Sequence, residues 1–78
     1  MKKDAITLTT LAARLERAIH ADVGMHGLKI LLYGWKTKYG LIGDHTLAFR
    51  EKADGEQWLS MAEASHFSRY CGYDLTQN

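Results

Sequence analysis

The stretch Leu28-Lys29-Ile30-Leu31-Leu32-Tyr33-Gly34-Trp35 decides the fold, because it fits two kinds of secondary structure. Its apolar residues match a helical spacing about as well as they match a buried strand, and periodicity alone does not separate the two. Five of the seven glycines lie between residues 24 and 43. Each glycine inside a helix costs about 1 kcal/mol relative to alanine, so this composition favours a strand over residues 28–35.

A helix over residues 28–38 is the alternative, and it would change the architecture. Combined with a helix earlier in the chain, it would make residues 8–38 a helical pair. Such a pair resembles the front of a winged-helix domain, and the resemblance implies a winged-helix-like fold.

The segment before this stretch has the clearest pattern in the chain. Its apolar residues recur at helical spacing and form one stripe, which predicts a helix over residues 8–23. Thr7 can cap the start of this helix, and Gly24 can supply the left-handed residue that ends it. The stripe consists of Leu8, Leu11, Ala12, Leu15, Ala18, Ile19 and Val23.

The second half of the chain begins with a predicted β-hairpin. Residues 46–52 and 57–60 read as strands, and Asp54-Gly55 is the typical central pair of a two-residue type I′ turn. In that register Glu51 faces Trp58, and the apolar side chains of Leu47, Phe49 and Trp58 share one face.

A second helix is predicted over residues 61–71. Ser60 and Glu63 form a capping box, in which each side chain can bind the backbone amide of the other residue, and Gly72 can end the helix. We therefore predict a small α+β domain over residues 1–78 without a linker. It has an N-terminal helix, a two- or three-stranded antiparallel sheet with its hairpin around Asp54-Gly55, and a C-terminal helix.

Composition excludes several classes of protein. The chain has 78 residues, of which 46% are hydrophobic and 24% charged, as in ordinary globular domains. The single cysteine, Cys71, cannot form an internal disulfide, which favours a reducing, cytoplasmic setting. The polar residues after Met1-Lys2-Lys3 do not resemble a signal peptide, and no apolar run is long enough to span a bilayer.

The sequence carries no recognisable catalytic, metal or nucleotide motif. The four histidines show no repeated spacing, whereas a zinc site usually has ligands in paired short spacings. Cys71 lies on an apolar stripe without a cationic neighbour that would lower its pKa, so it reads as a small buried hydrophobic residue. We expect no enzymatic activity, no cofactor and no metal.

One stretch combines aromatic rings with positive charge. No acidic residue occurs from Val23 to Gly43, whereas the chain as a whole has a net charge of only +1. On a strand, the rings of Tyr33 and Trp35 would lie on the face opposite the core and would be exposed beside lysines. Such a surface could stack nucleic-acid bases and attract phosphates, or it could anchor a protein interface. Alternatively, Trp35 and Tyr39 complete the core and the lysines are solvated. The predicted partner-binding residues are Lys29, Tyr33, Trp35, Lys36, Lys38 and Tyr39.

These observations support two hypotheses about function. The first is a non-enzymatic interaction protein of the inhibitor or adaptor type, such as the anti-defence proteins of phages and mobile elements, which binds a protein or nucleoprotein partner through the aromatic and lysine surface. The alternative is a nucleic-acid-binding regulator that reads duplex DNA or stacks single strands. No membrane partner is expected, and a homodimer is compatible with either hypothesis.

Overall fold

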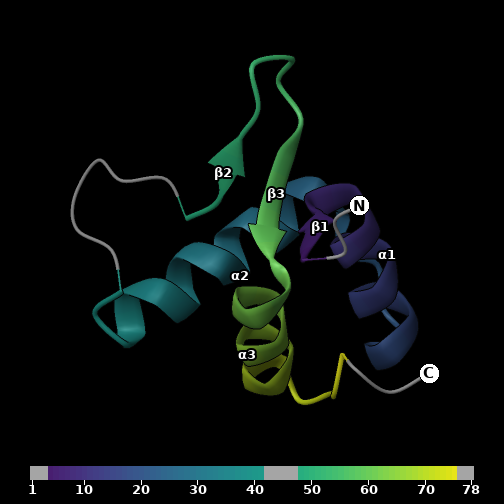
Figure 1. Ribbon diagram of the computed structural model, residues 1–78. Coiled ribbons are helices and arrows are strands. Elements are labelled where there is room, and N and C mark those ends of the chain that lie inside the picture. The colour runs from purple at the N-terminus through teal and green to yellow at the C-terminus, as the bar shows by residue number, and fades with distance from the viewer. Residues whose placement is uncertain (1–3, 42–47, 76–78) are drawn as a thin grey trace.

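The computed structural model describes residues 4–41 and 48–75. Its three strands form one antiparallel sheet in the order β1-β3-β2, and three helices pack around it (Figure 1). The predicted small α+β fold with an antiparallel sheet and flanking helices is confirmed. In chain order the elements are β1 (Ala5–Thr7), α1 (Leu8–Ile19), α2 (Gly24–Lys38), β2 (Arg50–Glu51), β3 (Gln57–Ser60) and α3 (Met61–Cys71).

Helix α1 begins where the sequence predicts and ends earlier. The Thr7 hydroxyl accepts a hydrogen bond from the Thr10 amide at 3.2 Å, so the predicted N-cap is confirmed. The helix ends at Ile19 and not at Val23, because His20 adopts the left-handed conformation with φ of 58°. The prediction missed this end because histidine rarely adopts a positive φ, whereas glycine does so readily.

The predicted strand over residues 28–35 is wrong, and the alternative helix is confirmed. Helix α2 begins at Gly24, and Gly27 and Gly34 lie in its interior. They cost the helix about 1 kcal/mol each. Three buried apolar side chains on one side of α2 each contribute roughly 1.5–3 kcal/mol, which outweighs that cost. These side chains are Leu28, Leu32 and Trp35.

The third strand of the sheet is β1, which the sequence analysis did not predict. Ile6 of β1 lies opposite Leu59 of β3, and both side chains are buried. The strand has three residues, which is too short for an alternating pattern to be recognised. It places α1 directly after the sheet edge.

The hairpin is confirmed, but its register differs from the predicted one by one residue. Arg50, not Glu51, lies opposite Trp58. The amide of Lys52 donates to the Glu56 carbonyl oxygen at 2.8 Å, which closes a three-residue loop. A type I′ turn needs a positive φ at both central residues, and only Gly55 has one, at 91°. Leu47, which was predicted to share the inner face, lies outside the described residues.

Both predicted ends of α3 are confirmed. Ser60 and Glu63 form the capping box, and Gly72 ends the helix with φ of 100°. Beyond it, the amide of Tyr73 donates to the Ser68 carbonyl oxygen at 3.0 Å, and the buried Leu75 packs into the core. Helix α3 is thereby fixed to the sheet at its start and to the core at its end.

Helices α1 and α2 are joined by the four-residue turn 20–23 and followed by the β2–β3 hairpin, which projects away from the helices (Figure 1). A helical pair followed by a hairpin agrees with the order of elements in the winged-helix-like alternative, which stays a prediction. None of the helices in the described parts of the chain has the length and apolarity that crossing a membrane requires.

Candidate functional site

The six predicted partner-binding residues all lie on α2 or directly after it, but their surroundings differ. One pair faces the hairpin, one pair is buried, and one pair lies beside α3. The structure therefore divides the predicted surface into three parts: Lys29 with Tyr33, Trp35 with Lys36, and Lys38 with Tyr39.

The middle pair is not part of the surface. The Trp35 ring is 5% exposed and packs edge to face on Phe67 of α3, with 5.6 Å between ring centroids. Lys36 is 8% exposed. The expectation that Trp35 presents an exposed ring is wrong, because that expectation depended on a strand in which it pointed away from the core.

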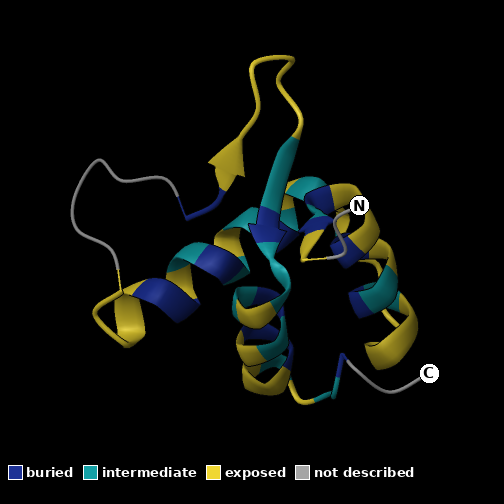
Figure 2. Cartoon of the chain, in the orientation of Figure 1, coloured by how far each residue is buried: buried dark blue, intermediate teal, exposed yellow. Residues whose placement is uncertain are grey.

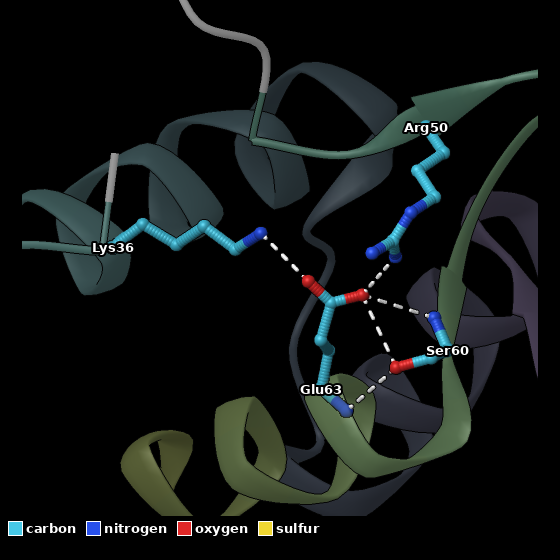
Figure 3. A network of polar contacts seen from close by, with 4 residues as sticks. All are labelled: Lys36, Arg50, Ser60 and Glu63. Carbon is cyan, nitrogen blue, oxygen red and sulfur yellow. Dashed lines mark hydrogen bonds and ion pairs between the residues drawn. The ribbon is translucent and has the colours of Figure 1, made fainter. Parts of the chain in front are cut away.

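Lys36 is buried because its ammonium group has a carboxylate partner. Its Nζ lies 2.9 Å from Oε2 of Glu63, and the other carboxylate oxygen accepts hydrogen bonds from Arg50 and from the amide and hydroxyl of Ser60 (Figure 3). Lys36 belongs to α2, Arg50 to β2 and Ser60 to the end of β3, and Glu63 lies in the first turn of α3. The Glu63 carboxylate thus joins α2 and β2 to the junction of β3 and α3.

The environment of Glu63 keeps this carboxylate ionised. Burial alone would raise its pKa, but the hydrogen bonds from Lys36, the Ser60 amide and Arg50 outweigh burial and lower the pKa to about 2. The site is therefore a structural ion-pair network at neutral pH. The capping box predicted one of its bonds, and the two cationic partners come from outside that motif.

A second carboxylate fixes the other end of α2. Oε2 of Glu16 in α1 accepts hydrogen bonds from the amides of Val23 and Gly24, at 2.9 and 2.8 Å. These bonds lower the pKa of Glu16. Helix α2 has no capping side chain of its own, so Glu16 takes that role across the turn. The sequence analysis missed it, because a cap normally lies within three residues of the amide that it binds.

The outer face of α2 consists of the residues that point away from the core. No carboxylate occurs on this helix. Lys29 lies at one border of the face, with its ammonium group 5.3 Å from the centroid of the Phe49 ring, and it extends over apolar surface. The outer face comprises His26, Ile30, Tyr33, Gly34 and Thr37, of which Tyr33 is partly buried and the others are exposed.

The C-terminal end of α2 forms a second surface together with α3. Three large apolar side chains are exposed here, namely Tyr39 (57%), Leu41 (56%) and Tyr70 (39%). They surround an open hollow of about 490 Å³, which Trp35, His66 and Arg69 also line. We call this surface, with Lys38 beside it, the aromatic patch. The sequence analysis identified Trp35, Lys38 and Tyr39 here. It missed His66, Arg69 and Tyr70, because these residues of α3 lie about thirty positions further along the chain.

The remaining chemistry of the described residues is limited. No group of three or more histidine, cysteine or acidic side chains among residues 4–41 and 48–75 is placed to hold a metal ion. Burial raises the pKa of the Cys71 thiol to about 11, so the thiolate is scarcely populated at neutral pH. The two surfaces of α2 are therefore the candidate sites.

No family model, no curated protein and no solved structure matches this chain.

Proposed function

We propose that the protein binds duplex DNA, with the outer face of α2 in the major groove. The observation that carries this proposal is the helical pair α1–α2, whose second helix turns a face free of carboxylates to solvent. Two helices joined by a turn of three or four residues form the helix-turn-helix arrangement, in which the second helix enters the groove. The major groove is about 12 Å wide and admits one α-helix.

The side chains of the outer face suit distinct contacts with DNA. His26 and Thr37 can hydrogen-bond to base edges or phosphates, and Lys29 can attract a phosphate from the border of the face. Ile30 is 58% exposed and can pack on the methyl group of a thymine. Gly34 leaves open space above the helix, since a Cβ atom built there would meet no atom within 4 Å. The helix backbone can therefore approach the groove closely at this point.

The hairpin contributes little to this proposed interface. Its residues 50–57 carry three carboxylates and two cations. Arg50 is paired with Glu63, and the Nζ of Lys52 lies 2.9 Å from the carboxylate of Glu56. Cations that are already paired release fewer counterions from DNA. The proposal therefore assigns the main contacts to α2.

A binding titration at two salt concentrations tests the proposal. Fluorescence anisotropy of a labelled random-sequence duplex should show non-specific binding with a dissociation constant of about 1 to 100 µM. The single phosphate contact of Lys29 predicts an affinity loss of about three- to fourfold between 50 and 200 mM salt. Equal affinity for single strands would support base stacking instead, and binding that is insensitive to salt would contradict the proposal.

A matched pair of variants locates the contact. Gly34→Glu places a carboxylate at the centre of the outer face without a steric clash, and glutamate favours a helix more than glycine does. We expect this variant to stay folded and to lose at least about tenfold in affinity for duplex, because the new charge faces phosphates. Ala62→Glu adds the same charge at an exposed position of α3 and should retain binding. Equal affinities of the two variants would place DNA elsewhere on the molecule.

A further inference from the structure

We propose that the aromatic patch is a docking site for an acidic segment of a partner protein, which inserts a large apolar side chain into the hollow between α2 and α3. The proposal does not depend on DNA binding, because the patch and the outer face share no residue. The sequence led to the hypothesis of a protein partner. The aromatic patch assigns that partner a surface and a chemistry, namely an apolar side chain flanked by acidic residues.

Several large apolar side chains gather in the patch, although exposed hydrophobic residues on a monomer are usually scattered. Tyr39 and Tyr70 meet edge to face, with 6.4 Å between their ring centroids. Leu41 is held beside them, since its amide donates to the Lys36 carbonyl oxygen at 2.7 Å. The rigid core residue Trp35 also lines the hollow. Aromatic side chains around a concave surface are typical of the centres of protein interfaces.

The charges around the hollow specify the partner. Arg69 lines it, and Lys38 lies above both tyrosine rings, with its Nζ 5.7 and 5.8 Å from their centroids. None of the six residues that line the hollow carries a carboxylate. Acidic residues on either side of an inserted apolar side chain would therefore lie close to the positive charges of Lys38 and Arg69. Complementary charge increases both the rate and the specificity of association.

A second copy of the chain fits this surface poorly. A twofold contact brings the same patch of both copies together, so Lys38 and Arg69 would face their own equivalents. Stacked nucleic-acid bases fit poorly as well. The tyrosine rings are nearly perpendicular, at 85°, and the ammonium group of Lys38 lies over one face of each ring. Base stacking needs free and accessible ring faces.

A selection from random peptides tests the ligand chemistry. A phage-displayed library of random peptides is selected on the full chain after depletion on the Tyr70→Ala variant. The expected result is enrichment of peptides in which aspartate or glutamate flanks a large apolar residue. No enrichment, or enrichment of peptides without net negative charge, would overturn the proposal.

The affinity of an enriched peptide for point variants then tests the location. Arg69→Glu reverses an exposed charge, and Leu41→Asp removes an exposed apolar side chain, so both variants should remain folded. Each variant should bind the peptide with an affinity at least about tenfold lower than that of the unmodified protein. Gly34→Glu adds a negative charge outside the aromatic patch, so it controls for the change in net charge and should leave peptide binding unchanged. Peptide binding that survives both patch variants would refute the proposed location.

The same variants separate the competing occupants. Sedimentation analysis of the free protein should show a monomer, and a dimer that Leu41→Asp dissociates would show that a second copy occupies the patch. Loss of duplex binding in Arg69→Glu, without effect on the peptide, would assign the patch to DNA. Failure of the DNA proposal alone leaves the peptide results unaffected, because the two probes are measured separately.

Discussion

The two ends of α2 are held in different ways. At the N-terminal end, the partly buried carboxylate of Glu16 binds the amides of Val23 and Gly24. At the C-terminal end, Trp35 packs on Phe67, and Lys36 is buried against the carboxylate of Glu63. Figure 2 shows buried, intermediate and exposed residues alternating along α2.

The residues of α2 that stabilise the fold are separate from those that we propose to bind a partner. The core requires the side of α2 that carries Leu28, Leu32 and Trp35, so substitutions there should act on folding. The outer face contributes little packing, and substitutions there should act on binding.

The largest expected effect comes from Trp35→Ala. Removing a buried aromatic side chain costs about 3–5 kcal/mol, a large part of the stability of a domain this small. The matched variant Ile30→Ala removes an exposed side chain of the same helix and should change the free energy of unfolding by about 0.5 kcal/mol or less. Urea denaturation followed by circular dichroism measures both. Similar losses of stability in Trp35→Ala and Ile30→Ala would show that the outer face of α2 contributes to folding as much as its core side does.

Glu63→Gln should have the next largest effect. The amide keeps the shape of the side chain but leaves Lys36 buried without a charged partner, and such a loss costs about 3 kcal/mol. Glu63→Gln together with Lys36→Met should recover part of this loss, because no unpaired charge remains. If the double variant is as unstable as Glu63→Gln, the ion pair is not the reason for the loss.

The pH dependence of stability gives an independent measure of the same group. The folded-state pKa of Glu63 is about 2, below the ordinary value of 4.5. Its contribution to stability is therefore complete above about pH 5 and decreases as the pH falls towards 2. Glu63→Gln should show a flatter dependence in this interval. Parallel curves for the two proteins would show that other carboxylates dominate acid unfolding.

The smallest expected effect is that of Glu16→Gln. The carboxylate binds backbone amides and not a buried cation, so its loss should destabilise the protein less than Glu63→Gln. The effect should be local, and the amides of Val23 and Gly24 should exchange faster with solvent while those of α3 keep their protection. The hydrogen-exchange rates of individual amides, measured by NMR, test this. Uniformly faster exchange throughout the molecule would mean that Glu16 supports the whole fold.

Local signals in the sequence predicted several boundaries of the fold. The cap at Thr7, the capping box of Ser60 and Glu63, and the left-handed Gly72 each depend on residues within a few positions of one another. The apolar side chains of Leu8, Leu11 and Leu15 recur within one helix, and all three are buried. Such signals are reliable because their partners lie in the same segment.

The candidate sites were only partly predictable. The sequence located the cationic and aromatic segment that became α2, but not which of its residues remain at the surface. Tyr70 and Arg69 of the aromatic patch belong to a helix whose position relative to α2 no local pattern specifies. The inhibitor or adaptor interpretation stays a prediction, because no structural feature tests it.

The sequence by itself therefore determined the α+β class, the hairpin around Asp54-Gly55 and the ends of α3, since these depend on short-range hydrogen bonds and turn geometry. Only the tertiary structure decided that residues 24–38 form a helix and that Lys36 is buried within it. The physical reason is that both outcomes depend on partners supplied by α3. Phe67 covers the Trp35 ring, and Glu63 supplies the charge that lets an ammonium group leave water.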